Sequence, residues 1–429
     1  MTGGRFGIWL LSTLIAGPSF ADTLQSALEK AKGSNPAILA AQSGAAAAQA
    51  AAQSADRLRY PVVTVSGSLA RLDHSPMLDM ATPAGRLQSP QIFKDDQIKS
   101  ATADLTIPLF TSGRIQGAID ASRAEAAASA ATAIQTRSDV GLSVVSAYLD
   151  VLRARRAETV TQARVRALES HQQTVAALYA REGVPKTDAL TVEVALANAR
   201  ADDHHAHNAV RTAEDVYVDL VGGTPGESPD LEEPGDETPI GRGDLGVLFS
   251  EALDRRADLR ALVAQRDALN DAAVAERGNS LPQIGVRAGW QHMDTQILDR
   301  ADVASVGIGF EWKLFDSGQT AARVSALHFR AKATDRLVDS MRLSIRRELS
   351  AALRSIEDAR SRLVAGDQAV ESAEENLRLA TRLYETGLTT NTSVLEALAA
   401  RADAQMRQIS ARYDVTLADY QMRHALGRL

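Results

Sequence analysis

The chain has no cysteine in its 429 residues, and aromatic residues make up only 4% of it. The absence of cysteine excludes disulfide bonds, thiolate metal sites, a cysteine nucleophile and a lipid-modified N-terminal cysteine. The 45% of hydrophobic residues is rich in alanine, which favours long helices packed closely side by side over an aromatic core. The net charge of −7 argues against nucleic acid as the main partner.

Long apolar runs and catalytic motifs are also missing. No segment beyond the first residues offers the roughly 20 consecutive apolar residues that a membrane helix needs. The sequence has no glycine-rich phosphate loop ending in Lys-Ser/Thr, no His-Glu-x-x-His and no Gly-x-Ser-x-Gly motif. We therefore expect neither an enzyme nor a cofactor.

The first 21 residues have the layout of a secretory signal peptide. Arg5 precedes the apolar stretch 6–16, and Ser19 and Ala21 place small residues just before the expected cleavage. The alternative is a buried N-terminal helix. We predict an exported protein whose mature chain begins near Asp22.

The mature chain is a tandem duplication. Pro61 closes an alanine-rich helical segment, and Pro282 stands in the same place 221 positions later, whereas Gly113 and its counterpart Gly318 are 205 positions apart. The copies therefore differ by about 16 residues between two strands. The sequence predicts four regions, namely a signal peptide at 1–21, a first repeat at 22–221, a flexible acidic linker rich in proline and glycine at 222–245, and a second repeat at 246–429.

Each copy contains one very long helix. The helical pattern is unbroken over 113–182 and 318–386, and about 70 residues of α-helix would extend roughly 100 Å. Apolar residues recur in 4-3 alternation, which is the spacing of a coiled-coil seam. In the second copy the seam runs from Ile345 to Tyr384, and in the first it ends at Tyr179 with Gln172 as a polar interruption. Shorter helices are expected at about 24–57, 187–221, 246–279 and 390–426.

Four segments alternate apolar and polar residues with the period of a β-strand. They span about 61–72, 99–110, 282–293 and 303–315. Their length suits strands of an outer-membrane barrel, with Trp290 and Trp312 on apolar faces as girdle residues at the membrane interface. An ordinary half-buried sheet explains the alternation equally well. Four strands cannot close a membrane barrel, so several chains would have to share one.

Two segments join the paired strands. The first, at about 73–97, is long and rich in proline, and the second, at about 295–302, is short. We expect both to be loops, with the long one on the cell exterior, where barrel loops run long.

Three motifs, in order along the chain, resemble the TolC family of outer-membrane efflux channels. They are Leu281-Pro282-Gln283-Ile284, Leu314-Phe315-Asp316-Ser317-Gly318-Gln319 and Gly183-Val184-Pro185-Lys186-Thr187-Asp188-Ala189-Leu190. The resemblance covers essentially the whole mature chain. It implies a mainly α fold with a small membrane β part, built from a tandem helix-strand-strand-helix-helix repeat. Three chains would join four strands each into a twelve-stranded outer-membrane β-barrel, and the long helices would form a coiled-coil α-barrel in the periplasm.

The same resemblance implies a function and partners. The homotrimer would be the exit duct for drugs, other small molecules or polypeptides of type I secretion, with a periplasmic adaptor protein and an inner-membrane pump at its tip and outer-membrane lipid around its barrel. Two other classes remain as alternatives. A periplasmic coiled-coil adaptor would carry one long hairpin rather than two, and a structural protein without a pore has no use for four alternating strands.

By this resemblance, the turns at the far ends of the long helices form the periplasmic tip. The residues expected to dock the adaptor are Gly183, Val184, Pro185, Gly387, Leu388, Thr389 and Thr390. Thr389 stands where the family carries an arginine, and Gly183 is displaced by one position from the family pattern.

Four residues near these turns are expected to control the entrance, namely Asp188, Tyr384, Ser393 and Glu396. Tyr384 matches the family pattern, and Asp188 keeps its spacing from Tyr179. Glu396 falls on an acidic position of the family, whereas Ser393 stands where a second acid is expected. We expect Glu396 to form a threefold carboxylate ring that attracts cations, and the alternative is a helix carboxylate in solvent.

One further stretch has the spacing of a metal site. Asp203 and His207 lie one helical turn apart in the histidine-rich stretch 202–207. A charged helix face in solvent explains this pattern as well as two metal ligands do, and we assign no metal to it.

Overall fold

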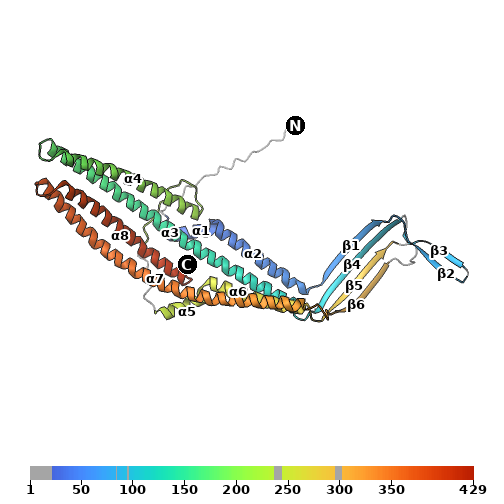
Figure 1. The fold of residues 1–429 in the computed structure, drawn as a ribbon. Helices are drawn as coiled ribbons and strands as arrows, with labels where there is room; N and C mark the ends of the chain where they lie inside the picture. Colours follow the sequence, from blue (N-terminus) through green and yellow to red (C-terminus); the bar gives the residue numbers. More distant parts are fainter. Residues whose placement is uncertain (1–21, 84, 94–95, 236–243, 295–301) are drawn as a thin grey trace, which may run out of the picture. The chain divides into compact units, whose positions relative to one another are not determined.

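The computed structural model describes residues 22–83, 85–93, 96–235, 244–294 and 302–429 (Figure 1). The predicted signal peptide, the short segment 295–301 and the linker residues 236–243 lie outside this part. The chain forms two compact units. Unit 1 contains the described residues of Met1–Leu39, Thr136–Arg256 and Ile345–Leu429, and unit 2 contains those of Ala40–Gln135 and Ala257–Ser344.

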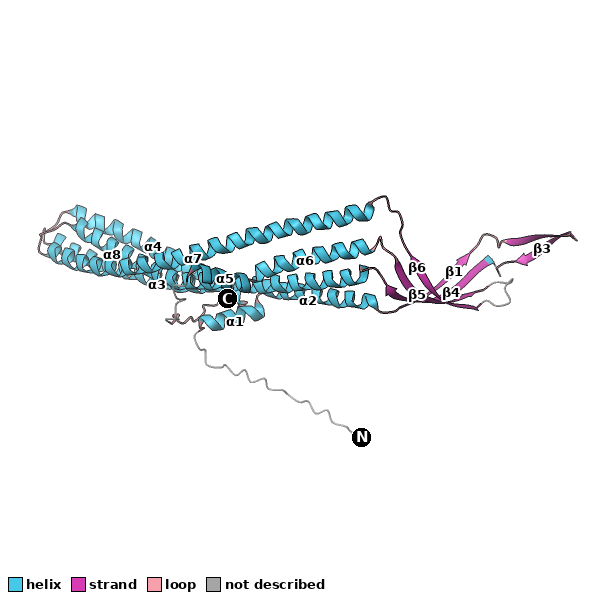
Figure 2. Cartoon of the chain, turned by 90° about the horizontal axis from the view of Figure 1, so that it is seen from below, coloured by secondary structure: helices cyan, strands magenta, loops and turns pink. Residues whose placement is uncertain are grey.

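Unit 1 is built from helices (Figure 2). It contains α1 (Leu24–Ser34), α4 (Lys186–Val221), α5 (Leu245–Arg255), α8 (Asn391–Ala425) and the C-terminal parts of α3 (Arg114–Tyr179) and α7 (Gln319–Glu385). Helix α3 turns back into α4, and α7 turns back into α8, so the unit holds two long helical hairpins.

The coiled-coil seam forms the core of these hairpins. In α7, Ile345 and Leu349 are completely buried, and in α3 Val144 and Val151 are as well. The C-terminal ends of the two long helices differ, because Tyr384 is 5% exposed and its repeat counterpart Tyr179 is 45% exposed. The prediction that Tyr179 continues the seam was therefore wrong. A repeated sequence does not guarantee a repeated environment, because each copy packs against different neighbours.

Two of the expected shorter helices are interrupted. The segment expected at 24–57 is broken at Asn35, which has an extended backbone, and α2 (Pro36–Asp56) begins at the following proline. The Asn35 side chain donates a hydrogen bond to the carbonyl of Leu220, 3.0 Å away, which fixes the break against α4. The segment expected at 246–279 is broken in the same way at Arg256, which is 5% exposed and pairs with Glu348.

The linker between the repeats is not loose in its described part, 222–235. Asp22 forms a β-bridge with Leu231, whose side chain is 8% exposed in the core of unit 1. The hydroxyl of Tyr148 lies 2.6 Å from the carbonyl oxygen of Glu232, and that of Tyr413 donates to Glu233 over 2.9 Å. The expectation of a flexible segment was wrong for these residues, because apolar packing and tyrosine hydrogen bonds hold them on the helices.

Unit 2 joins helices to a four-stranded antiparallel sheet in the order β1-β4-β5-β6. The strands are β1 (Val62–Arg71), β4 (Gln97–Phe110), β5 (Gln283–Met293) and β6 (Asp302–Glu311). The unit also contains most of α2, the short 3-10 helix η1 (Arg57–Arg59), α6 (Ala257–Gly278) and the N-terminal parts of α3 and α7, which lie at one end of the strands (Figure 1). The turns into α3 and α7 use positive φ angles at Ser112 and Ser317 and at the glycine that follows each of them.

The segment at about 73–97 is not simply a loop. It contains β2 (Met77–Thr82) and β3 (Gly85–Gln91), which pair as an antiparallel hairpin of their own. These strands were missed because their residues show no regular alternation of apolar and polar side chains.

Candidate functional site

The turn between α3 and α4 ends the first hairpin with a Schellman motif. The amide of Gly183 donates to the carbonyl of Leu178 at 3.0 Å, and the amide of Glu182 donates to that of Tyr179 at 2.9 Å. Glu182 occupies the left-handed position of the motif, with φ 55°. Gly183 follows it, and a Cβ there would lie 3.3 Å from the carbonyl oxygen of Leu178.

The turn between α7 and α8 repeats this motif, with glycine in the left-handed position. Leu388 donates its amide to Leu383 at 2.8 Å, and Gly387 donates to Tyr384 at 3.0 Å. Gly387 holds the left-handed position, with φ 74°. The displaced glycine of the first copy is thereby explained. The backbone places Glu182, not Gly183, in the role of Gly387, and Gly183 serves the close approach to the end of α3.

The residues after each turn begin the returning helices. Pro185 is the N-cap of α4, and its fixed φ suits that position. Thr390 is the N-cap of α8, and its hydroxyl accepts a hydrogen bond from the amide of Ser393 over 3.4 Å. The Ser393 hydroxyl lies 3.1 Å from the same Thr390 oxygen, so the structure places Ser393 in the cap of α8. Leu388 is the most exposed apolar side chain of the two turns, at 75%.

A buried polar cluster joins the two hairpins just behind the turns. The hydroxyl of Tyr384 lies 3.5 Å from a carboxylate oxygen of Asp188, and the amide of Asn391 donates to the Asp188 carbonyl over 3.2 Å. Asn391 Oδ1 is 2.7 Å from His171 Nε2, and the His171 ring lies 5.3 Å from that of Tyr384. Each hairpin supplies two members, so the cluster ties α3 and α4 to α7 and α8.

Three members of this cluster are almost completely buried. His171, Asn391 and Tyr384 are 7%, 3% and 5% exposed, and polar groups buried to this extent are costly unless they are paired. Burial raises the pKa of Tyr384, and the negative charge of Asp188 raises it further. The phenol is therefore neutral and can donate a hydrogen bond to the carboxylate of Asp188.

Sequence reasoning found two members of this cluster and missed the other two. It identified Asp188 and Tyr384, but it assigned the polar seam position to Gln172 rather than to the adjacent His171. Helical register drifts by a fraction of a turn over several heptads, so a seam extrapolated from the core misplaces such a residue by one. The sequence did contain a signal for the place of Asn391. It directly follows Thr390, a residue type that often caps a helix, so Asn391 could have been placed at the start of the returning helix.

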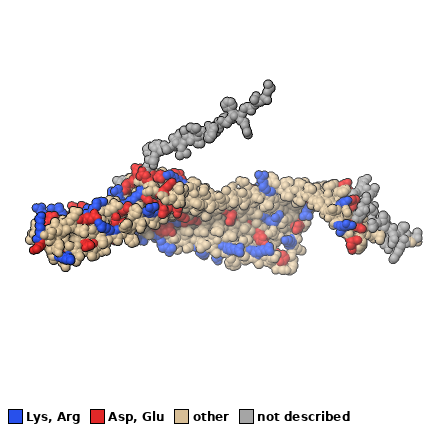
Figure 3. All heavy atoms as spheres, turned by 90° about the horizontal axis from the view of Figure 1, so that it is seen from above, with Lys and Arg blue, Asp and Glu red and all other residues tan. Residues whose placement is uncertain are grey.

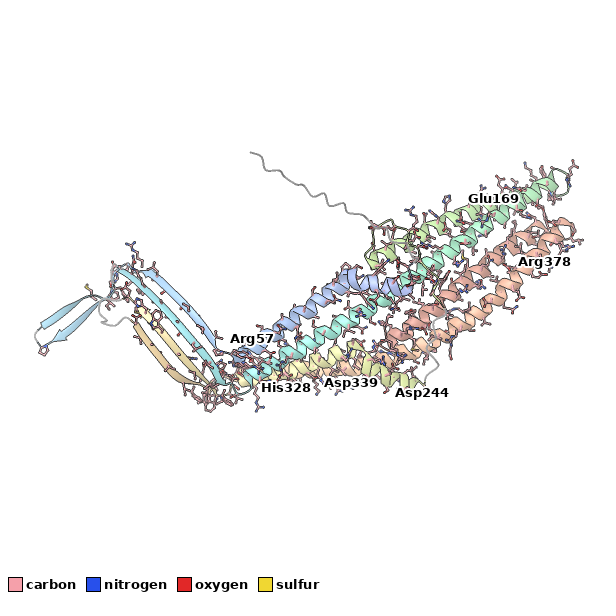
Figure 4. All side chains as sticks on the ribbon, turned by 180° about the vertical axis from the view of Figure 1, so that it is seen from behind. Arg57, Glu169, Asp244, His328, Asp339 and Arg378 are labelled. Carbon is pink, nitrogen blue, oxygen red and sulfur yellow. The ribbon has the colours of Figure 1, made fainter. Side chains whose placement is uncertain are left out.

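Glu396 does not belong to this cluster. Its side chain is exposed on α8, one turn beyond Ser393, and it forms no ion pair or hydrogen bond with the described residues. The tip carries mixed charges along its length, as Figure 3 shows for one face of the helices. Glu169 on α3 and Arg378 on α7, labelled in Figure 4, pair within their own hairpins, with Arg200 and Glu375 at 2.8 and 2.7 Å.

The two members of the suspected metal pair contact helix α3. Asp203 accepts a hydrogen bond from Thr161 at 2.8 Å, and His207 Nδ1 lies 2.9 Å from a carboxylate oxygen of Glu158. Among the residues that the structure describes, no group of three or more His, Asp or Glu side chains is arranged to hold a metal ion.

The sheet of unit 2 has one apolar and one polar face. Strand pairing sets Val65, Ala103, Trp290 and Ala304 in one row across the four strands. The polar face carries rows such as Ser66, Thr102 and Gln291, with a hydroxyl pair at 2.7 Å between the first two. The apolar face is uncovered, because Val65, Val306 and Ile308 are 76%, 78% and 75% exposed. No element in the part of the chain that the structure describes covers this face as an ordinary half-buried sheet would require.

The two tryptophans lie at different levels of this face. Trp290 is paired with Ala304 near the outer part of β5, and Trp312 follows the end of β6, where its indole donates to the Ser280 carbonyl at 3.1 Å. From Ala304 to Trp312 the chain advances roughly 26 Å at the usual rise of a strand. They are 41% and 49% exposed. None of the described helices is apolar over enough of its length to cross a bilayer.

Comparisons with known proteins agree with this architecture. The sequence model of the family described as outer membrane efflux protein matches residues 27–223 and 248–428. The outer membrane efflux protein BepC of Brucella suis is 26% identical over 66% of this chain and 62% of its own length, so the match leaves more than a third of that relative uncovered. The outer membrane protein OprJ of Pseudomonas aeruginosa is 23% identical over 76% of this chain and 71% of its own length.

The fold has close counterparts among solved structures. The outer membrane protein VceC of Vibrio cholerae superimposes with a TM-score of 0.80 over 94% of this chain and 96% of its own, at 19% sequence identity. The mainly α fold with its four membrane-type strands is thereby confirmed. With both repeats matched by one family model, the chain is a member of the outer membrane efflux protein family, whose proteins transport molecules and are not enzymes.

Proposed function

We propose that three copies of this chain form a channel-tunnel through which drugs, other small molecules or secreted polypeptides leave the cell. The observation that carries the proposal is the open sheet of unit 2, with its uncovered apolar face and unpaired outer edges on β1 and β6. Exposed strand edges and apolar faces are stable only when another chain and lipid cover them. Three sheets of four strands make a closed barrel of ordinary size, in which the polar faces line the pore.

The outer membrane is the proposed site of action, reached through the signal peptide at residues 1–21. The apolar faces would contact lipid there, with Trp290 and Trp312 at the interfaces. The hairpins of unit 1 would extend into the periplasm as the α-barrel, with the described linker residues 222–235 packed on them and the two repeats as the structural units.

The turns are the proposed docking points for a periplasmic adaptor protein, which would connect the tunnel to an inner-membrane pump. They offer Gly183, Val184, Pro185, Gly387, Leu388, Thr389 and Thr390, and the exposed Leu388 gives an apolar contact. Replacing Leu388 by aspartate should abolish efflux-dependent drug resistance while the trimer still forms. Full resistance in that variant would exclude the turn as a docking point.

The polar cluster behind the turns is the proposed lock of the entrance. Opening requires the hairpins to separate, and contacts of Asp188 with Tyr384 and Asn391 oppose that movement. Asn391 contacts the main-chain carbonyl of Asp188, so both contacts are removed only in the double variant Asp188→Ala/Asn391→Ala, which should raise the single-channel conductance in planar bilayers. An unchanged conductance would mean that this cluster supports the fold and does not restrict the pore.

Glu396, with Ser393 one turn before it, is the proposed cation-attracting constriction. Its carboxylate is exposed and unpaired among the described residues, which suits a ring repeated around a threefold axis. Glu396→Gln should reduce cation selectivity and block by divalent cations, and the exposed carboxylate Glu193 of α4 gives a matched control.

The proposed function as a whole is tested with the mature chain. We expect a detergent-extracted trimer in the outer-membrane fraction and a steady conductance after it is added to a planar bilayer. A monomer in the soluble periplasmic fraction would overturn the proposal.

A further inference from the structure

A small polar cavity lies in unit 2 where the sheet meets the helices. Its volume is about 210 Å³, and its walls are formed by Arg114, Asn279, Leu281, Gln283, Glu311 and Lys313. Gln283 and Glu311 are direct partners across β5 and β6, in the same alternating set as Arg287. The cavity therefore opens on the polar face of the sheet.

Two cations of this cavity have no carboxylate partner among the described residues. The Nε of Arg114 donates to the neutral amide oxygen of Gln283 at 3.1 Å, and Lys313 is exposed without an ion pair. The cavity's acid, Glu311, lies 4.0 Å from Arg287, outside the cavity wall, and both of these side chains are 72% exposed. Two cations and one carboxylate therefore line the cavity, and this carboxylate also lies near Arg287.

A close approach between α6 and α3 fixes the backbone of Arg114. A Cβ on Gly278 would lie 2.6 Å from the backbone nitrogen of Arg114, so only glycine lets the end of α6 meet the start of α3 this closely. A Cβ on Gly117 would likewise lie 2.6 Å from the backbone nitrogen of Ala275. Arg114 also begins α3, where the helix dipole adds partial positive charge.

Arg287 has small neighbours along β5 and on the β6 side of the polar face, whereas Thr106 of β4 lies opposite it on the other side. Gly285, Gly289, Gly307 and Gly309 are its neighbours along β5 and across on β6. A strand rich in glycine is weaker than one with branched side chains, so these small neighbours have a cost in stability. They leave the guanidinium of Arg287 accessible beside the cavity. Asp104, the other acid of this face, is opposite Gly289 and does not line the cavity.

We propose that this cavity binds the anionic group of a passing molecule, a carboxylate or a phosphate, at the level of the pore where the sheet meets the helices. The proposal rests on the proposed function, because the polar face lines a pore only in a closed barrel. Guanidinium and ammonium groups without counter-ions bind such oxyanions through charge-assisted hydrogen bonds. In the trimer the cavity occurs three times around the axis, which concentrates positive charge at one level of the pore.

The test is block of single-channel current by pyrophosphate and by citrate, each added to the full mature trimer in a planar bilayer. Both anions should reduce the conductance, and the half-blocking concentration should be about fivefold higher for Lys313→Gln, as expected for a partly exposed ionic contact. Lys313→Arg should restore the block. A difference between the two anions would tell whether phosphate or carboxylate is the preferred group.

Lys99→Gln is the matched control. Lys99 is an exposed lysine of the same sheet, but its pairing with Leu69 places it in the alternating set of the apolar face. It should leave the block unchanged. If Lys313→Gln does not assemble, Arg114→Gln carries the same test.

The possible failures are distinct. A channel that conducts but is not blocked by either anion, or is blocked equally in Lys313→Gln, overturns this inference and leaves the proposed function standing. An absence of any conductance removes the proposed function, and this inference with it.

Discussion

Large apolar residues are buried in the core of unit 1 but exposed on the sheet of unit 2. In unit 1, Ile345 and Leu349 of α7 are completely buried between helices, whereas in unit 2 Val306 and Ile308 of β6 are 78% and 75% exposed. Burial of each such side chain from water contributes about 1.5–3 kcal/mol, so the exposed set represents a large unfavourable surface for an isolated chain. The helical unit has a core of its own, although single apolar residues such as Leu388 remain exposed, whereas the apolar face of the sheet depends on lipid and on other chains.

Replacing Val306 by arginine should have the largest effect on assembly. Val306 lies opposite Ala288 on the apolar face, and an arginine at the midplane of a bilayer costs about 2–4 kcal/mol per chain. We expect Val306→Arg to abolish the heat-resistant trimer in outer-membrane extracts. The neighbouring Ser305→Arg, on the polar face, should insert and assemble normally. Equal losses in the two variants would contradict the assignment of the faces.

In the helical unit, loss of the buried amide of Asn391 should have the largest effect. Asn391→Leu leaves His171 and the carbonyl of Asp188 without their partner, which costs about 1–3 kcal/mol. Thermal unfolding of the purified protein should show this loss. Asn376, an exposed asparagine of α7, provides the control, and Asn376→Leu should change stability by less than about 0.5 kcal/mol.

Alkaline pH should weaken the contact between the linker and the helices. Burial raises the pKa of Tyr413 from 10.0 to about 12, and its hydrogen bond to Glu233 contributes to the shift. Because the folded state holds this proton more tightly than the unfolded state, the stabilisation is complete below pH 10 and is lost as the pH rises through 12. Protease cleavage of the linker should therefore increase over this range.

Tyr413→Phe removes the titrating hydroxyl and keeps the packed ring, so it distinguishes the effect of ionisation from that of packing. The variant should lose roughly 1 kcal/mol at neutral pH with its hydrogen bonds, but the further loss above pH 10 should be smaller than in the wild type. An alkaline loss of the same size in both proteins would show that Tyr413 is not the group responsible.

The smallest expected effect compares the two turns of unit 1. Glu182 adopts a left-handed conformation that glycine adopts without steric cost, so Glu182→Gly should stabilise the protein by roughly 0.5–1 kcal/mol. Gly387→Ala, at the matching position of the second turn, should destabilise it by about 1 kcal/mol. Thermal unfolding measures both, and a loss of stability in Glu182→Gly would show that the glutamate side chain makes a favourable contribution of its own.

Several features of the site were accessible from sequence, and the reason is local. The strand alternation, the glycine of the second turn and the seam of α7 each follow from the conformational preference or period of a short segment. Asp188 and Tyr384 were found through the family resemblance. His171 was missed because its burial depends on the packing of two hairpins, and the β2–β3 hairpin was missed because its residues show no regular alternation.

The amino-acid order by itself determined the duplication, the long helices and the two-faced strands, because these depend on periodicities that each segment carries alone. Only the tertiary structure decided that the apolar face stays open, that Glu182 takes the left-handed position, and that His171 and Asn391 join Asp188 and Tyr384. The position of Glu182 depends on the geometry of its own turn, whereas the open face and the cluster depend on residues far apart in the sequence, whose contacts are set by the packing of whole helices and strands.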